Sequence, residues 1–162
     1  LAQGKLMNSA VLSIVDFSLP SSHKRLFVIN VKSQELIFYD YVAHGKNSGA
    51  AIAKSFSNKI NSLKSSLGFF VTKNTYNGKN GLSLALDGKE KGINAHALAR
   101  AVVIHGAPYV NENFATQKNG IGRSWGCPAV PENINKSLIE TIKDGSCFFI
   151  YAPIYKKESA SL

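Results

Sequence analysis

Short β-rich runs bounded by glycine, asparagine, serine or lysine constrain the fold of this chain more than any other feature. Six such runs lie at residues 26–31, 36–42, 68–72, 82–86, 101–105 and 147–151. Runs of this kind between turn residues are typical of strands. The first two runs are separated by Lys32-Ser33-Gln34-Glu35 and predict a hairpin. We expect the polar stretches 74–81 and 111–122 to be connections.

Two segments have the apolar spacing of a helix. Residues 5–15 predict a short amphipathic helix from the positions Leu6, Met7, Ala10, Val11, Ile14 and Val15. A second helix is predicted where Ile134, Leu138 and Ile142 recur every four residues before Gly145. Together with the strands, this predicts a mainly β fold, a sandwich or barrel with short helices at its edges. The length of 162 residues favours one domain over residues 1–162.

The chain is basic, with 19 Lys and Arg against 10 Asp and Glu, a net charge of +9. Such a surface favours an anionic partner, for example a carboxylate-rich cell wall, or serves solubility alone. Nucleic acid is not expected, because no Lys/Arg run interleaves with aromatic residues. No apolar stretch reaches the roughly 20 residues that span a bilayer, so we expect no stable membrane insertion. We also expect a monomer. The first residues, Leu1-Ala2-Gln3-Gly4, indicate a processed or trimmed end, which leaves export open.

The two cysteines lie in different settings. Cys147 falls in an apolar run that predicts a buried strand, whereas Cys127 falls in a loop rich in glycine and proline. A disulfide-stapled scaffold would need more cysteines, and we expect no disulfide between these two. Cys127 is therefore the candidate for chemistry and Cys147 the structural cysteine.

The candidate site combines Ile104-His105-Gly106 with residues 122–130, Gly-Arg-Ser-Trp-Gly-Cys-Pro-Ala-Val. An apolar strand brings His105 to its end, and the loop then brings Cys127, 22 residues later. Gly126 can adopt positive φ, and Pro128 has no N–H, so oxyanion donors must come from Cys127 itself and from Gly126 or Trp125. A nearby His105 would favour the thiolate and protonate the leaving amine. The alternative is a buried structural cysteine beside a core histidine. The order of histidine before cysteine argues against a papain-type enzyme.

These residues resemble the L,D-transpeptidase (YkuD-type) catalytic domain, and more closely its murein L,D-transpeptidase catalytic-domain branch. The similarity rests on the loop at 122–130 and on His44-Gly45-Lys46-Asn47-Ser48-Gly49, and extends from about Asp40 to Val130. It implies a mixed β-sandwich, barrel-like domain, a cysteine acyl-enzyme, and neither metal nor cofactor. It also implies a periplasmic or secreted, wall-facing setting.

The resemblance assigns roles by position. It makes Cys127 the nucleophile, His105 the base, Gly106 the residue whose carbonyl orients that base, and Ser124 the loop serine. Two positions depart from the commoner family pattern. Trp125 stands where that pattern has histidine, and Ala129 stands where it has an arginine associated with the site's structure and substrate recognition.

Further residues are weaker candidates. His44 and Ser48 are expected either to contact substrate or only to form a turn. Trp125 and Tyr109 are expected to wall the cleft, as is Tyr76, although aromatic residues are packing residues first. Of the three arginines, Arg25 and Arg100 are expected to lie away from the catalytic end. Arg123 is expected to bind a substrate carboxylate or to brace the loop, with a solvated charge as the alternative.

The expected reaction is acyl transfer on a murein stem peptide. Cys127 attacks the carbonyl that follows an L-configured centre, by resemblance the diamino acid, D-Ala leaves, and an amine on a second stem takes the acyl group. With water as acceptor the enzyme would be an L,D-carboxypeptidase. Another murein amide hydrolase and a non-catalytic cell-wall-binding module remain alternatives. The His and Cys spacings match no zinc pattern, so no metal site is expected.

Overall fold

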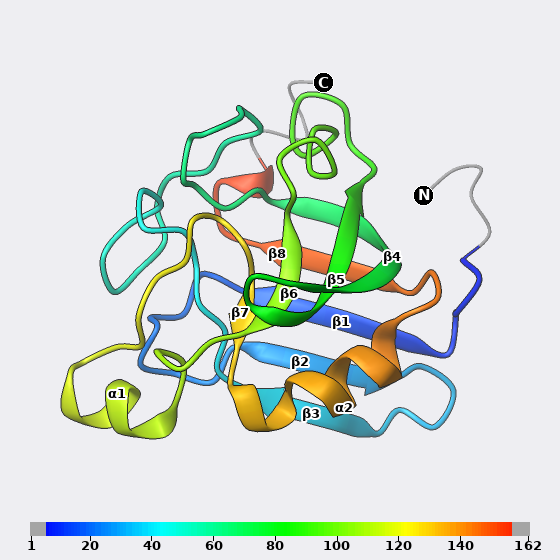
Figure 1. Ribbon diagram of the computed structural model, residues 1–162, viewed down its shortest axis with the longest axis horizontal. Coiled ribbons are helices and arrows are strands. Elements are labelled where there is room, and N and C mark those ends of the chain that lie inside the picture. The colour runs from blue at the N-terminus through cyan, green and yellow to red at the C-terminus, as the bar shows by residue number, and fades with distance from the viewer. Residues whose placement is uncertain (1–5, 157–162) are drawn as a thin grey trace.

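One mixed sheet of eight strands organises the chain in the computed structural model, which describes residues 6–156. Its order is β3-β2-β1-β8-β4-β5-β6-β7, and the pairs β1–β8 and β6–β7 are parallel. The strands are β1 (Val11–Asp16), β2 (Leu26–Asn30), β3 (Leu36–Asp40), β4 (Gly68–Gly78), β5 (Gly81–Gly88), β6 (Val103–Gly106), β7 (Ala129–Val130) and β8 (Cys147–Tyr151). β5 and β6 run steeply across the direction of β1–β3, so the sheet curls into a nearly closed barrel (Figure 1). The expected mainly β, barrel-like class is confirmed.

The first strand corrects the prediction of a helix over residues 5–15. Residues 11–16 form β1 between β2 and β8, and none of residues 6–10 is helical; residue 5 lies outside the described residues. Val11, Ser13 and Val15 are buried, while the residues between them are half-buried. A strand covered on both faces has apolar residues at nearly every position, and such a run also satisfies a helical spacing.

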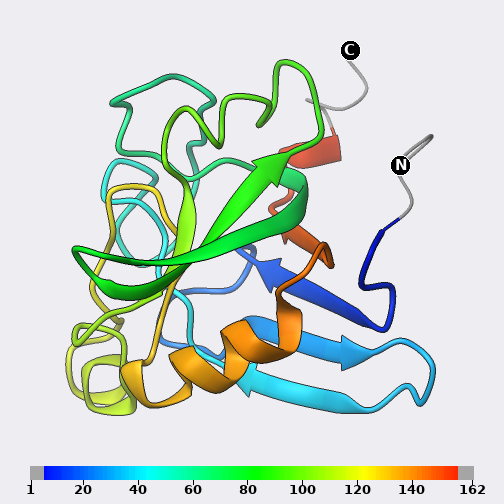
Figure 2. The same ribbon diagram turned by 45° about the vertical axis from the view of Figure 1, so that its right-hand side comes forward.

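The hairpin β4–β5 is longer than expected. Both predicted strands are confirmed, but the stretch predicted as a connection belongs mostly to the strands and leaves only Lys79 and Asn80 between them. Gly81 follows with a φ of 76°, which glycine adopts without strain. The tip of this hairpin reaches the side of the molecule where β6 and β7 lie (Figures 1 and 2). The other predicted connection contains a short helix, α1 (Glu112–Gln117).

The predicted helix near the C-terminal end is confirmed as α2 (Glu132–Ile142). Its buried face includes Leu138, Ile139 and Ile142, which join the main core with Phe70 and Phe148 of the sheet. Figures 1 and 2 show α2 beside the β2–β3 hairpin. A second, smaller core lies under the loops before and after α1, and its members are Tyr41, Ala43, Ala107, Val110, Ala115, Ile121 and Ala129. These two cores fix both ends of the segments that carry the candidate site.

Neither cysteine forms a disulfide, as the sequence predicts. Cys147 is buried on β8, the setting expected of a structural cysteine. No helix within residues 6–156 is long and apolar enough to cross a membrane.

Candidate active site

His105 lies near the end of β6, and the backbone orients its imidazole. It pairs with Ser83 of β5 and Ala129 of β7, and only 4% of its surface is exposed. Its Nδ1 is 2.9 Å from the carbonyl oxygen of Gly106. Because a carbonyl oxygen only accepts, Nδ1 must carry the hydrogen, which leaves the lone pair of Nε2 available. This is the tautomer that a general base facing the cleft requires.

Ser124 holds the turn that presents Cys127. Its hydroxyl donates to the Cys127 carbonyl oxygen at 2.6 Å and accepts from the Gly126 N–H at 3.1 Å. Gly126 has a φ of +128°, and a Cβ there would lie 2.8 Å from the Lys64 carbonyl oxygen, so the turn requires glycine. One expectation changes: because the Gly126 N–H is bonded to Ser124, it is not free to donate to an oxyanion.

The segment before His105 encloses the Cys127 thiol. The Val103 N–H points at Sγ, 3.5 Å away, and the thiol donates to the Ala101 carbonyl oxygen at 3.6 Å. Burial raises the pKa of the Cys127 thiol, whereas the Val103 N–H and the charge of Arg100 lower that pKa. No hydrogen bond joins Sγ to the His105 imidazole. Catalytic hydrogen bonds of this kind often tighten only when substrate is bound.

Cys127 and His105 line the same cleft, which has a volume of about 390 Å³. The loop that carries the candidate nucleophile Cys127, residues 122–130 and called the nucleophile loop below, and the turn of the β4–β5 hairpin both contribute to its walls. None of its lining residues is acidic, while three are cationic, namely Lys79, Arg100 and Arg123. The cleft is therefore electropositive and suited to an anionic substrate.

Arg100 lies in this cleft, and the prediction that placed it away from the catalytic end is wrong. That prediction assumed an extended strand from Ala101 to His105. β6 instead begins at Val103, and Ala101 has a φ of 52°, a left-handed conformation that turns the chain. A non-glycine residue rarely adopts this conformation, and nothing in the sequence signals it.

Arg123 braces the nucleophile loop. Its Nη1 donates to the carbonyl oxygens of Lys46 and Gly49, each at 3.1 Å, while the side chain also lines the cleft. The loop is tied to the same segment through its backbone, because the Ser124 N–H donates to His44 O and the Lys46 N–H donates to Ser124 O. Of the two roles expected for Arg123, the geometry favours bracing.

His44 is sealed inside the molecule and does not line the cleft, which corrects its candidate role in substrate contact. It is fully buried, with Nδ1 2.8 Å from Nη2 of Arg25 and Nε2 3.1 Å from the Gly49 carbonyl oxygen. Because a guanidinium only donates, Nδ1 accepts and Nε2 donates. Burial, helped by the charge of Arg25, lowers the pKa of His44 to about 4. Arg25, expected to be a remote hairpin residue, is equally buried and bonds Val42 and His44.

The remaining candidates divide between turn and cleft. Ser48 is buried, and its hydroxyl accepts from the Ser65 N–H at 2.8 Å, so it is a turn residue rather than a substrate contact. Tyr109 and Trp125 line the cleft, whereas Tyr76 does not. Trp125 is 72% exposed, and the Lys79 ammonium lies 5.9 Å from its ring centroid. Trp125 thus forms an open rim rather than a closed wall.

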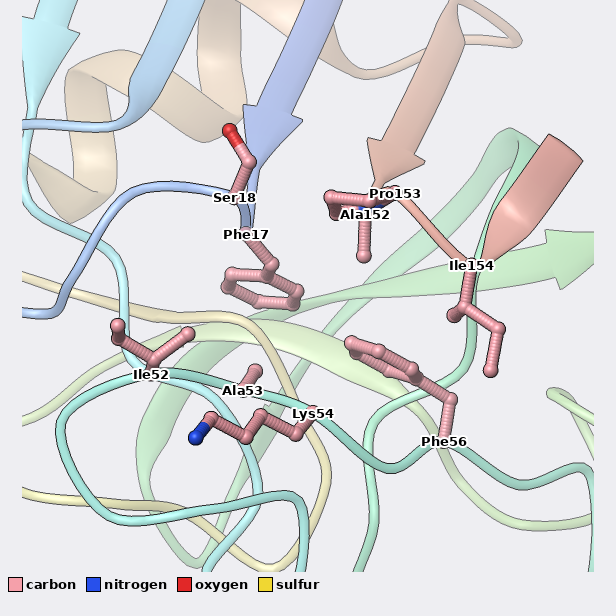
Figure 3. A pocket seen from close by; sticks show the side chains of 9 residues that line it. All are labelled: Phe17, Ser18, Ile52, Ala53, Lys54, Phe56, Ala152, Pro153 and Ile154. Atoms are coloured by element: carbon pink, nitrogen blue, oxygen red, sulfur yellow. The ribbon is translucent and has the colours of Figure 1, made fainter.

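A second hollow, of about 230 Å³, lies elsewhere and has a different character. Figure 3 shows the rings of Phe17 and Phe56 and the side chain of Ile154 gathered around it. Its lining residues include no cysteine, histidine or carboxylate, and Lys54 is its one charged residue. This hollow therefore lacks the nucleophile and base candidates that line the cleft with Cys127.

Comparisons with known proteins identify the family and the fold. The family model of the L,D-transpeptidase catalytic domain matches residues 2–151. An L,D-transpeptidase from Mycobacterium smegmatis is 13% identical with a TM-score of 0.55, over 90% of this chain and 60% of that one. The helical cell shape determining protein Pgp2 from Campylobacter jejuni is 15% identical with a TM-score of 0.54, over 91% and 49%. The LD transpeptidase LdtMt1, solved in complex with imipenem, is 12% identical with a TM-score of 0.55, over 89% and 60%.

At these identities the structural likeness shows the fold, and the chain spans only 49–60% of the length of these three proteins. A comparison with curated proteins finds no match. The family model, by contrast, covers nearly the whole sequence, including His105, Cys127 and the segment around His44. The chain therefore belongs to the L,D-transpeptidase catalytic domain family.

Proposed function

We propose that this chain is a peptidoglycan L,D-transpeptidase that works through an acyl-enzyme on Cys127. The observation that carries the proposal is one cleft that contains both the thiol of Cys127 and the imidazole of His105, with Nδ1 of His105 held by Gly106. A nucleophile, a base and a group that orients the base are the parts that acyl transfer needs. An enzyme that acts on peptidoglycan works at the cell envelope, and we expect this one in the periplasm or secreted.

In the first half-reaction Nε2 of His105 takes the proton of the Cys127 thiol, and the resulting thiolate attacks the carbonyl that follows the L-centre of a stem peptide. The C–N bond then breaks, His105 gives its proton to the departing D-Ala amine, and a thioester remains on Cys127. In the second half-reaction an amine of another stem attacks the thioester, His105 takes the amine's proton, and the thiolate leaves. His105 serves alternately as base and as acid, which its single free ring nitrogen, Nε2, permits.

The oxyanion of the tetrahedral intermediate is stabilised by the backbone N–H groups of Cys127 and Trp125. Two neighbouring residues cannot supply a donor, because the Gly126 N–H is bonded to Ser124 and Pro128 has no N–H. Fixed donors of this kind contribute about 10²–10³-fold in rate. Ser124 supports them indirectly, because it bonds both ends of the turn.

The cleft favours stem peptides, which are rich in carboxylates. Lys79 and Arg123 offer positive charge on its walls, and no acidic residue lines it. Hydrolysis is the second candidate, because Trp125 at the rim is 72% exposed and does not close over the cleft. Water in place of the amine makes an L,D-carboxypeptidase.

Purified murein fragments test both outcomes. Incubation with a tetrapeptide stem, followed by mass spectrometry, should give a cross-linked dimer for a transpeptidase and a tripeptide for a carboxypeptidase. The carbapenem imipenem, bound in the structure of LdtMt1, serves as an independent acylating probe. Recovery of all murein fragments unchanged, with no imipenem adduct on the protein, would reject the cysteine enzyme in favour of a wall-binding module.

A further inference from the structure

A positive charge without a carboxylate partner lies next to the proposed nucleophile. The guanidinium of Arg100 makes four hydrogen bonds, all to uncharged groups: the carbonyl oxygens of Ser57 and Lys64 and the hydroxyls of Ser62 and Ser66. In the salt bridges between described residues the acidic partners are Asp87 and Glu140, and the basic partners are lysines, so Arg100 takes part in none. Its charge is therefore held in place but not neutralised.

Two sets of contacts place this charge close to Cys127. On one side, a Cβ built on Gly126 would lie 3.4 Å from Nη2 of Arg100, so the guanidinium lies beside the residue that precedes the nucleophile. On the other side, the residues that follow Arg100 contact Sγ directly, through the Ala101 carbonyl and the Val103 N–H. The segment 100–103 thus surrounds the thiol with one cation and one backbone donor.

We propose that Arg100 stabilises the thiolate of Cys127 and so sets the reactivity of the nucleophile; this rests on the proposed function. Arg100 acts through Cys127 and is a positioning residue. Arginine stays protonated across the working pH range, and a fixed charge in a partly desolvated cleft acts more strongly than in water. His105 is then free to serve the leaving amine and the incoming one.

The sign of the contribution that Arg100 makes to the thiol pKa agrees with this geometry, although burial is the larger effect and the pKa lies above its ordinary value. Burial raises it, and the groups that oppose burial are the Val103 N–H and Arg100. The other titratable groups on the same cleft include His105 and Tyr109; burial raises the pKa of the Tyr109 phenol, so Tyr109 stays neutral. Without Arg100, one of the two groups that oppose burial would be lost, and the thiol pKa would rise further.

A purely structural role for Arg100 has to be separated from this one, because its four bonds also hold residues 57–66 against the cleft. The two roles can be told apart by the pKa of the Cys127 thiol. This pKa is measured from the pH profile of Cys127 alkylation by iodoacetamide, in a Cys147→Ser background. We expect Arg100→Gln to raise the Cys127 pKa by about one unit or more, which slows alkylation at pH 7 about tenfold or more. Arg100→Lys should keep the pKa near that of wild type, although both variants lose the planar fork and should lower Tm alike.

The matched control is Lys79→Gln, which removes a cation from the rim of the same cleft and should leave the thiol pKa unchanged. Equal thiol pKa values in wild type and a folded Arg100→Gln would overturn the proposal. So would a pKa that rises as far in Arg100→Lys as in Arg100→Gln, because the fold rather than the charge would then be responsible.

A second pair of variants keeps the test open if Arg100→Gln does not fold. Ser62 accepts from Nη2 of Arg100 at 3.2 Å. Ser62→Asp places a carboxylate there and neutralises the guanidinium, whereas Ser62→Asn is its uncharged match. We expect a higher thiol pKa in the Asp variant than in the Asn variant, and equal values would overturn the proposal.

The two proposals fail separately. If imipenem and murein fragments acylate wild-type Cys127, but the Cys127 pKa is the same with and without Arg100, only the role of Arg100 fails. If the thiol pKa follows Arg100 but neither compound acylates Cys127, only the transpeptidase function fails.

Discussion

Two histidines, each followed by glycine, show how hydrogen bonding and access to a cleft decide the use of a residue. His105 has one ring nitrogen bonded to a backbone carbonyl and the other free at a cleft. His44 has both ring nitrogens bonded and no exposed surface. The sequence pairs His44-Gly45 and His105-Gly106 are identical, so only the packing around them separates a base from a structural residue.

The identity of the nucleophile gives the first prediction. Imipenem should add its mass to Cys127 alone, because Cys147 is buried on β8 and lines no part of the cleft. Cys127→Ala should form no acyl-enzyme, while Cys147→Ser should retain acylation and at most lower Tm. Peptide mapping after imipenem treatment measures both. Imipenem mass on Cys147, or an acylated Cys127→Ala protein, would contradict the assignment.

His105 should matter more for amide substrates than for small alkylating reagents. His105→Ala should slow acylation by a murein tetrapeptide by roughly 10²–10⁴-fold, the usual contribution of a positioned acid or base. Iodoacetamide needs no proton for its leaving group, so its rate should fall much less. The matched control is His96→Ala, which removes an exposed histidine and should leave both rates unchanged. An equal loss with both compounds would remove His105 from the proton transfer.

At the scale of elements, the strands and α2 could be predicted because their apolar residues lie between clear turn signals. β1 could not, since a strand covered on both faces has no polar side to reveal its period of two. β7 has two residues, too few for a pattern, yet it pairs with His105 and so places Cys127 beside β6.

The candidate site was predictable where chemistry and turn geometry coincide in sequence, as in Gly126-Cys127-Pro128. The contribution of Arg100 was not, because it depends on the positive φ of Ala101 and on acceptors drawn from residues 57–66. The burial of Arg25 could not be predicted either, because its partners Val42 and His44 lie 17 and 19 residues further along the chain. Long-range contacts of this kind leave no local signal.

The nucleophile loop gives a prediction at the element scale. Arg123 ties this loop to Lys46 and Gly49 through a single nitrogen, Nη1. Because a lysine ammonium can also donate to two carbonyls, Arg123→Lys should keep kcat/KM for a murein tetrapeptide within a few-fold of wild type. Arg123→Ala should lower it roughly tenfold or more. Equal losses in the two variants would instead indicate bidentate binding of a substrate carboxylate, and no loss in Arg123→Ala would exclude both roles.

At the scale of the whole molecule, the cleft is supported by buried polar groups rather than by the main apolar core alone. Arg25 lies fully buried, and its guanidinium bonds Val42, Leu19 and His44. The chain segment that follows, 43–46, then bonds the backbone of the nucleophile loop at Ser124 and Ala129. The stability of the molecule and the placement of Cys127 therefore depend on one buried network, which has to remain fully paired.

This network predicts how stability depends on pH. The pKa of His44 falls from 6.5 in the unfolded chain to about 4 in the folded protein, because burial and Arg25 disfavour the imidazolium. Above pH 6.5 both states are neutral at this residue, so it contributes no pH dependence. Between pH 6.5 and 4 the unfolded state binds a proton that the folded state does not, so the free energy of unfolding falls as pH falls, by about 3 kcal/mol in all.

Urea denaturation of wild type and His44→Gln between pH 7 and pH 4 measures this contribution, because glutamine can still accept from Arg25 and donate to Gly49 without titrating. The carboxylates titrate in both proteins, so the difference between the two curves isolates His44. We expect wild type to lose stability more steeply than His44→Gln as the pH falls, while His23→Gln, which removes an exposed histidine, should follow wild type. Parallel curves for wild type and His44→Gln would show that His44 accepts its proton inside the fold at little cost, and that the Arg25–His44 contact is not the buried, neutral pair described above.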